Sequence, residues 1–191
     1  MFDSATWREV AVDQLVSFWE FAAKLKTEPR KGWLKKLRLQ RTESVADHSF
    51  ALSLLCLFEG ERRGCNMDKL LRLALLHDLE ESITGDLTPE DKYSKGAASV
   101  KAQKLSAREQ LLSGFPERNR QTYRGLWLEL DADNSKEAKL VHELDKLEMA
   151  LQAKEYARRG IDPVKLGQFY ATAKASISDP GLREILDELA A

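Results

Sequence analysis

The sequence predicts an all-α fold in a single domain, and three observations support this prediction. Glycine and proline are few, ten and five among 191 residues, and they fall between segments with helical periodicity. β structure has little support in the hydrophobic pattern, because apolar residues recur mainly every three or four positions. The length suits one domain with a real core, and no repeat or linker divides it.

The expected helices follow one another along the chain with short connections. The first has an apolar stripe that includes Val12, Leu15 and Trp19. The second begins near Ser44, because Ser44-x-x-Asp47 has the form of a capping box. In chain order the helices are expected at about 8–26, 44–63, 68–81, 96–114, 117–129, 135–159, 163–177 and 181–190.

Two connections stand out between these helices. Residues 29–40 are expected to form an irregular basic connection around Trp33. Residues 82–89 combine serine, threonine, glycine and proline and are expected to form a turn-rich loop. Together these patterns predict a helical bundle with one loop close to a group of acidic residues.

Charge and cysteine content exclude several classes of protein. The net charge of −1 gives no global attraction for nucleic acid or an acidic membrane, so any phosphate affinity is local. Cys56 and Cys65 suggest neither a disulfide framework nor a zinc knuckle, and Cys56 is expected to be a buried thiol. The first eight residues lack a signal pattern, and no apolar run approaches the roughly 18 residues of a membrane span. We therefore expect a cytoplasmic protein.

The dyad His77-Asp78 closes an apolar run and is the most informative feature of the chain. His48 lies upstream in the expected second helix, and Asp145 lies downstream beside the apolar stripe of another helix. That stripe consists of Leu140, Leu144, Leu147 and Leu151. Two imidazoles and two carboxylates from separate segments form a donor set that suits a divalent metal ion. The alternative is that the dyad caps a helix end and that Asp145 pairs with a lysine or arginine.

Acidic residues after the dyad extend the candidate site. Glu81 is three residues after Asp78 and is expected on the same helix face, and Asp86 follows in a loop that contains a glycine. Both are candidates for metal binding or proton transfer. His142 is a rival ligand but is expected on the helix surface. The remaining acidic residues nearby are expected to be solvated or ion-paired: Glu80, Glu143 and Glu148.

Substrate-binding candidates lie before the second helix. Arg41 can hold a phosphate with two parallel hydrogen bonds, or it can pair with Glu43 or Asp47. Trp33 can stack on a base or sugar, or it can anchor the core. The residues alone leave both alternatives open.

With these residues the chain resembles the HD-domain phosphohydrolases, and within them the 5′-deoxynucleotidase family. The resemblance extends from about Phe18 to the C-terminus. Its motifs are Gly32-Trp33, Arg41-x-Glu43-Ser44-Val45-x-Asp47-His48, Leu73-Ala74-Leu75-Leu76-His77-Asp78-x-x-Glu81-Ser82-Ile83-x-Gly85-Asp86, and Leu144-Asp145-Lys146-x-Glu148-Met149-x-Leu151-Gln152-Ala153.

The resemblance implies a single HD domain over residues 1–191, with the metal-site core at about 44–153 and C-terminal helices at 163–190 packed on it. It also implies a homodimer that hydrolyses deoxyribonucleoside 5′-monophosphates to deoxynucleosides and phosphate, with manganese, cobalt, another transition metal or magnesium as cofactor. The implied metal ligands are His48, His77, Asp78 and Asp145. Glu81 and Asp86 are implied as catalytic groups or, with the Leu87 carbonyl, as ligands of a second ion, and Trp33 is placed against the sugar.

The chain departs from the family pattern at two places. One extra residue lies between Trp33 and His48, and Gly32 stands where some members have an arginine that orients the phosphate. The candidates to replace that arginine are Arg30, Lys31, Arg38 and Arg41. Two other functions remain open: an HD-family hydrolase of a triphosphate, cyclic nucleotide or guanosine polyphosphate, and a non-enzymatic helical module that binds metal for stability.

Overall fold

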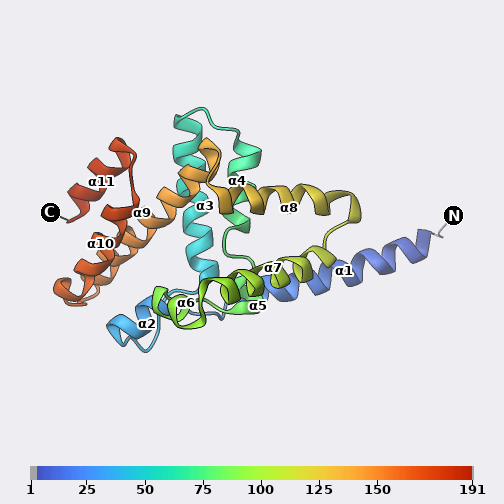
Figure 1. Cartoon of the computed structure of the whole chain (residues 1–191), viewed down its shortest axis with the longest axis horizontal. Helices are drawn as coiled ribbons and strands as arrows, with labels where there is room; N and C mark the ends of the chain where they lie inside the picture. The colour runs from blue at the N-terminus through green and yellow to red at the C-terminus, as the bar shows by residue number, and fades with distance from the viewer. Residues whose placement is uncertain (1–3, 191) are drawn as a thin grey trace. The chain divides into compact units, whose positions relative to one another are not determined.

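The computed structural model describes the backbone of residues 4–190 and the side chains of residues 12–189. Within these residues the regular elements are helices, apart from an isolated antiparallel bridge between Pro29 and Ser44 (Figure 1). The all-α prediction is therefore confirmed. The helices are α1 (Ser4–Leu25), α2 (Lys31–Leu37), α3 (Val45–Arg62), α4 (Met67–Leu76), α5 (Glu81–Thr84), α6 (Pro89–Lys95), α7 (Ala97–Ser113), α8 (Glu117–Ala132), α9 (Lys136–Arg158), α10 (Pro163–Ser176) and α11 (Pro180–Ala190).

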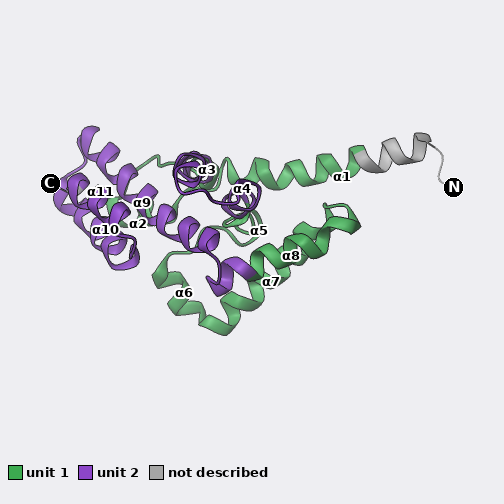
Figure 2. Cartoon of the chain, turned by 90° about the horizontal axis from the view of Figure 1, so that it is seen from above, with its two compact units in different colours: residues 1–47, 76–128 green, residues 48–75, 129–191 purple. Residues whose placement is uncertain are grey.

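The chain forms two compact units, each built from two stretches of sequence (Figure 2). Unit 1 contains residues 1–47 and 76–128, and unit 2 contains residues 48–75 and 129–191. None of the described helices is both long enough and apolar enough to cross a membrane.

Unit 1 packs α1 and α7 against the short helix α5, and α6 packs against α7. An aromatic group supports α1, because the Phe18 ring meets the Phe115 ring edge-on with centroids 4.7 Å apart. Tyr123 extends this group, with its ring centroid 4.0 Å from that of Phe115. Such pairs contribute about 0.5–1.5 kcal/mol each beyond the area they bury.

Unit 2 is organised around the long helix α9, which packs against α10 and α11. Its apolar face is buried at Leu140, Leu144 and Leu147, as the sequence stripe predicts. Each buried leucine of this kind stabilises the fold by roughly 1.5–3 kcal/mol. Gly60 allows α3 to approach the start of α4, since a Cβ there would lie 2.3 Å from Cδ2 of Leu70.

Three expectations about element boundaries are wrong. The loop expected over residues 82–89 is shorter, because its first three residues belong to helix α5 and Pro89 begins helix α6. The connection expected to be irregular over residues 29–40 contains helix α2, which buries Trp33 and Leu37 one turn apart. The third helix was expected to reach residue 81 but ends at Leu76, and residues 77–80 form a hydrogen-bonded turn. The Trp127 indole N–H donates to the Leu76 carbonyl at 3.0 Å, and this tertiary contact occupies a terminal helix acceptor.

Candidate metal centre

The position of His48 is set by the way α3 begins. The Ser44 hydroxyl accepts from the Asp47 backbone N–H at 3.1 Å, and the Asp47 carboxylate accepts from the Ser44 backbone N–H at 2.8 Å. This is the reciprocal capping box that the sequence predicts, and it fixes where the helix starts. His48 therefore falls in the first turn of α3, where it is completely buried.

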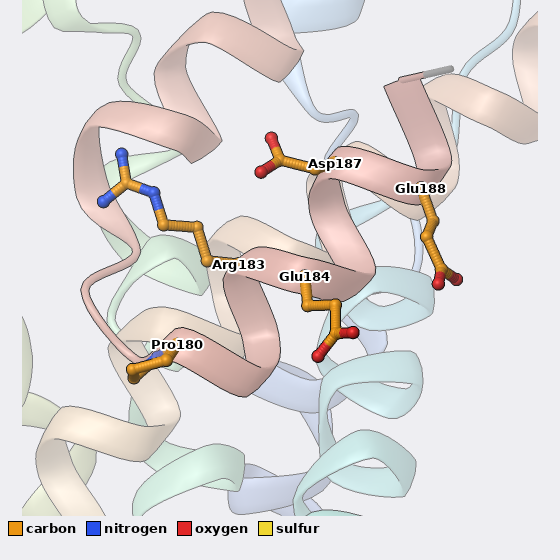
Figure 3. A pocket seen from close by; sticks show the side chains of 5 residues that line it. All are labelled: Pro180, Arg183, Glu184, Asp187 and Glu188. Carbon is orange, nitrogen blue, oxygen red and sulfur yellow. The ribbon is translucent and has the colours of Figure 1, made fainter.

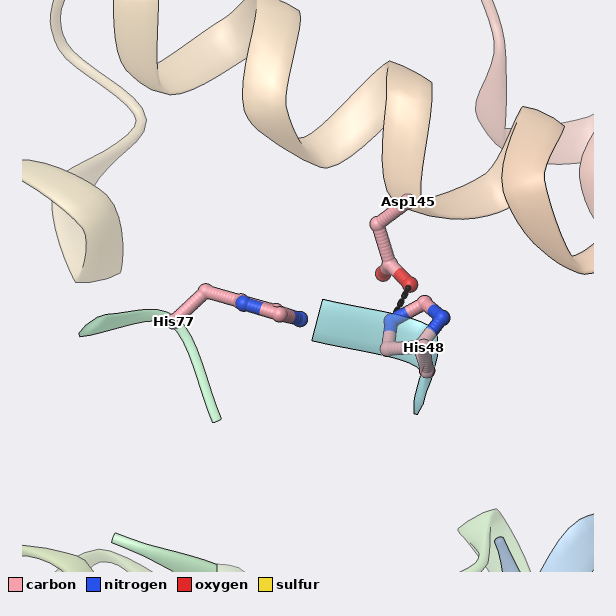
Figure 4. A group of neighbouring side chains, drawn as sticks. All are labelled: His48, His77 and Asp145. Carbon is pink, nitrogen blue, oxygen red and sulfur yellow. Dashed lines mark ion pairs between the residues drawn. The ribbon is translucent and has the colours of Figure 1, made fainter. Parts of the chain in front are cut away.

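Two carboxylates of α9 flank the His48 ring within unit 2. Nε2 of His48 lies 3.1 Å from Oδ1 of Asp145, as the dashed line in Figure 4 marks. Nδ1 of His48 lies 2.5 Å from Oε2 of Glu148. Asp145 and Glu148 are three residues apart, so both carboxylates project from the same face of α9.

This arrangement fits a cation at His48. When Nδ1 carries the ring proton and donates it to Glu148, the lone pair of Nε2 is directed toward the Asp145 carboxylate. A lone pair facing an anion is unfavourable unless a proton or a metal ion lies between them. His48 and Asp145 are thus part of a group able to hold a metal ion. Lys146 also pairs with Asp145, with Nζ 2.7 Å from Oδ2, as the alternative interpretation expected.

The His77-Asp78 dyad lies in unit 1, in the turn between α4 and α5. Nε2 of His77 lies 3.0 Å from Oδ2 of Asp78, and Nη1 of Arg30 lies 3.3 Å from the same oxygen. The three side chains are 8%, 16% and 17% exposed. Arg30, one of the four cations proposed to replace an arginine at Gly32, therefore contacts the dyad.

Glu81 is one of the buried carboxyls of unit 1, with 7% of its surface exposed. The helix face predicted for it does not exist, because α5 begins at Glu81 after the turn. Burial raises the pKa of Glu81 well above its ordinary value, and the negative charges of Asp78 and Asp86 raise it further. Among the described residues no hydrogen-bond partner reaches its Oε2 atom. These conditions favour a carboxyl that holds or transfers a proton.

Asp86 is held by three contacts from the segment that leads into α2. Its carboxylate accepts from the Lys31 backbone N–H at 2.5 Å, and its own N–H donates to Glu28 at 2.9 Å. The Lys31 ammonium donates to the Asp86 carbonyl at 2.9 Å. Gly85 makes the preceding bend with a φ of +71°. Leu87, whose carbonyl was considered for a second ion, follows in this loop and is half-buried.

The two substrate-binding candidates differ in exposure. Arg41 is exposed and open to a ligand. Trp33 is 2% exposed, and its indole N–H donates to Glu43 at 2.7 Å, which fits the core-anchor alternative. His142 lies on the exposed surface of α9 beside Asp133, as predicted.

The sequence does not predict the burial of Glu148 and Glu80. Glu148 was expected to be solvated or ion-paired, and it is 4% exposed and paired with His48. The available signal was its spacing of one helical turn from Asp145. Glu80 is fully buried and paired with two cations of α7.

A shallow hollow on α11 does not contain any of the candidate metal-binding or catalytic residues. It is lined by exposed residues of that single helix (Figure 3), Pro180, Arg183, Glu184, Asp187 and Glu188. None of these residues was a candidate in the sequence.

The helical fold, together with the pairing of His48 with Asp145, places the chain in the class of helical proteins that bind a metal ion through imidazole and carboxylate groups. Comparison with known proteins specifies the class further. The HD domain family model matches residues 22–185. The human protein named 5′-deoxynucleotidase HDDC2 is 34% identical over 188 residues, which cover 98% of this chain and 90% of the human protein.

A fission yeast relative and a solved structure agree with this match. The Schizosaccharomyces pombe protein named 5′-deoxynucleotidase hdd1 is 32% identical over 157 residues, 81% of this chain and 78% of that protein. A conserved hypothetical protein from Pyrococcus furiosus superposes with a TM-score of 0.72 and 31% identity, covering 91% of this chain and 98% of that one. The chain belongs to the HD domain family.

Proposed function

We propose that this protein is a metal-dependent 5′-deoxynucleotidase, which hydrolyses deoxyribonucleoside 5′-monophosphates to deoxynucleosides and phosphate. The single observation that carries the chemistry is the buried His48 imidazole between the carboxylates of Asp145 and Glu148. The substrate class follows from the names of the human and yeast relatives.

The proposed metal ligands are two imidazoles and two carboxylates: His48, His77, Asp78 and Asp145. Mixed nitrogen and oxygen donors suit manganese, cobalt or another transition metal, and magnesium is a weaker candidate because it prefers oxygen ligands. When bound, such an ion supplies Lewis-acid polarisation of a phosphoryl oxygen. Glu148 would orient the His48 ring by accepting a hydrogen bond from its Nδ1–H group.

Glu81 is proposed to accept the proton of the attacking water. Its raised pKa gives the carboxylate more affinity for a proton than an exposed glutamate has, and its Oε2 atom is not engaged by the described residues. Water attacks phosphorus as the bond to the 5′ oxygen breaks, and that oxygen leaves with a proton. Phosphate and the deoxynucleoside are the products.

Asp86 is proposed to bind a second ion, together with Glu81 and the carbonyl of Leu87, or to protonate the leaving oxygen. The hydrogen bond from the Lys31 backbone N–H holds Oδ2 of Asp86 in place for either role. The Glu28–Lys31 pair would keep this carboxylate in place.

Arg30 is proposed to orient the substrate phosphate. Its guanidinium lies against Asp78 and can hold two phosphate oxygens at once. Arg41 is a second candidate at an exposed position. Because Trp33 is buried, we propose that it shapes the sugar site by anchoring α2, where Lys31 and Asp86 meet.

A second copy of the chain is proposed to cover an apolar stripe on α3. The stripe consists of Phe50, Leu54, Leu57 and Phe58, which are 44–71% exposed and lie one or two turns apart. Large apolar residues gathered on one exposed face are typical of an interface. We also propose a cytoplasmic protein whose residues 1–191 act as one HD domain.

Phosphate release tests the proposed activity. The full chain is stripped with a chelator, resupplied with Mn²⁺, Co²⁺ or Mg²⁺, and assayed on matched deoxy- and ribonucleoside 5′-monophosphates. We expect metal-dependent release from the deoxy series. Asp78→Ala should lose both the metal and the activity, whereas the control Asp68→Ala, at an exposed carboxylate of α4, should keep both.

The outcomes separate the alternative functions. Release only from triphosphates, cyclic nucleotides or guanosine polyphosphates would indicate another HD-family hydrolase. A chelated protein that unfolds, with no hydrolysis under any metal, would indicate a metal-stabilised helical module. An active Asp78→Ala variant without metal would refute the proposed site.

A further inference from the structure

Glu80 is a charged residue of unit 1 with no solvent exposure. It lies between Asp78 and Glu81 in the turn that carries the dyad. Its Oε1 atom accepts from Lys104 Nζ at 2.9 Å and from Arg108 Nη2 at 3.2 Å. Its Oε2 atom is also buried and has no hydrogen-bond partner among the residues that the structure describes.

Both cations come from α7, and both remain charged. Burial lowers the pKa of Lys104, but the charge and hydrogen bond of Glu80, together with the charge of Asp78, raise it by more, so the net shift is upward. The Arg108 guanidinium lies 5.5 Å from the centre of the Trp127 ring. This distance is typical of a cation–π contact.

The turn is consequently held at both ends within unit 1. At its start, the Trp127 indole of α8 binds the Leu76 carbonyl. At its end, α7 binds the Glu80 carboxylate through Lys104 and Arg108. The stacking of Arg108 on Trp127 joins these two anchors into one network. Between the anchors lie His77 and Asp78, and Glu81 follows directly.

Buried ion pairs are an unusual way to stabilise a turn such as residues 77–80. Apolar residues of similar volume would often give equal or greater stability, since buried charges are costly to desolvate. A charged network does, however, define the direction and register of the groups it joins. A buried carboxylate at residue 80 therefore indicates that the ion pairs fix the position of the turn.

We infer that Glu80 is a positioning residue, which fixes the orientation of Asp78 and Glu81 by tying their turn to Lys104 and Arg108 of α7. The inference rests on the proposed function, in which Asp78 holds the metal ion and Glu81 handles a proton. Glu80 touches neither substrate nor metal in this account. It acts through its neighbours in the turn.

Glu80→Gln in the full chain tests this role, with Glu109→Gln as a matched control. Glu109 pairs with Arg124 and so joins α7 to α8, the two helices that anchor the turn, but it does so at an exposed position. We measure kcat and KM with saturating Mn²⁺, the affinity of the apo protein for Mn²⁺ by calorimetry, and amide hydrogen exchange at residues 77–81. Circular dichroism melting shows which fraction is folded at the assay temperature.

For Glu80→Gln we expect kcat and Mn²⁺ affinity to fall roughly 10- to 100-fold, the range found when outer-shell partners of a metal site are removed. KM should change far less, and exchange at residues 77–81 should become faster. Glu109→Gln should match the parent protein in all four. A folded Glu80→Gln variant with parental kcat, Mn²⁺ affinity and exchange, and only a lower melting temperature, would overturn the inference.

A second pair of variants covers the case in which Glu80→Gln does not fold. Lys104→Met should reproduce the loss of kcat and Mn²⁺ affinity, and Lys104→Arg, which keeps the charge, should restore most of both. Equal behaviour of these two variants would contradict the positioning role. If the parent protein hydrolyses no deoxynucleotide, the proposed function fails, and hydrogen exchange and Mn²⁺ affinity still decide the role of Glu80.

Discussion

Replacement of Glu148 tests how His48 is prepared for a metal ion. In the parent structure Oε2 of Glu148 lies 2.5 Å from Nδ1 of His48, and both side chains are almost entirely buried. Glu148→Gln preserves the volume and an acceptor oxygen but removes the charge. Glu148→Ala removes the acceptor and leaves the Nδ1 proton in a dry site without a partner.

The size of the effect follows from this geometry. A hydrogen bond to a charged group contributes about 1.5–3 kcal/mol, and tenfold in a binding constant is about 1.4 kcal/mol. Loss of the Glu148 acceptor should therefore weaken metal binding roughly 10- to 100-fold, which agrees with the cost of removing such outer-shell partners. Glu148→Gln should fall between the parent and Glu148→Ala, because it can keep a neutral hydrogen bond.

Calorimetric titration of the apo proteins with Mn²⁺ measures this effect, and thermal unfolding of the same samples measures stability. Glu155→Gln is the control, since Glu155 is on α9 and carries the same charge but pairs with Arg159 at the surface. Its Mn²⁺ affinity should equal that of the parent protein. A Glu148→Ala variant with parental affinity and parental melting temperature would refute the claim that Glu148 orients His48.

Three further predictions concern the backbone, a thiol and pH. Gly85→Ala forces an alanine to a φ of +71° and a ψ of 161°, so we expect the free energy of unfolding to fall by about 1–3 kcal/mol. We also expect a lower kcat, because the loop that carries Asp86 would be displaced. An unchanged melting temperature together with an unchanged kcat would contradict this prediction. Burial, and then the charge of Cys65, raises the pKa of Cys56 to about 12, so the native protein should react with Ellman's reagent at Cys65 alone. The Cys65→Ser variant should then not react, and equal reaction of both thiols in the parent protein would contradict this prediction. Arg63 lowers the pKa of Asp179 from 3.8 to about 2 by a hydrogen bond, so this carboxylate stabilises the fold above about pH 4. Its contribution, at most about 1 kcal/mol after solvent screening, is lost as the pH falls from about 4 to 2. In urea unfolding, Asp179→Asn should lack this loss of stability at low pH, and a pH dependence identical to that of the parent protein would exclude the assignment.

The local signals in the sequence predict the start of α3 and the burial of α9. The Ser44–Asp47 capping box involves residues three apart, so both partners are visible in the sequence, and His48 follows from it. The spacing of Leu140, Leu144 and Leu147 likewise reports the buried face of α9. Both predictions are confirmed because the interactions that decide them are local or periodic.

The end of α4 and the environment of Glu80 depend on distant partners. Leu79 continues the apolar pattern past Leu76 and no glycine or proline interrupts it, so the sequence predicts a longer helix. The helix ends where the Trp127 indole binds a carbonyl, a contact across 51 positions of sequence. The two cations paired with Glu80 also come from another part of the chain, Lys104 at 24 positions and Arg108 at 28 positions from Glu80. Helix propensity and charge pattern carry no information about such partners.

The capping box also has an evolutionary consequence for insertions and deletions. Each residue added to or removed from a helix turns everything beyond it by about 100°, so a length change between Ser44 and His48 would rotate the imidazole away from Asp145. The loop between Arg38 and Glu43 lies before the cap, and a residue gained there leaves the register of α3 unchanged. The extra residue that the motif spacing predicts between Trp33 and His48 would be accommodated in this loop. Lineages of this family can therefore be expected to vary in length on one side of Ser44 and to remain constant on the other.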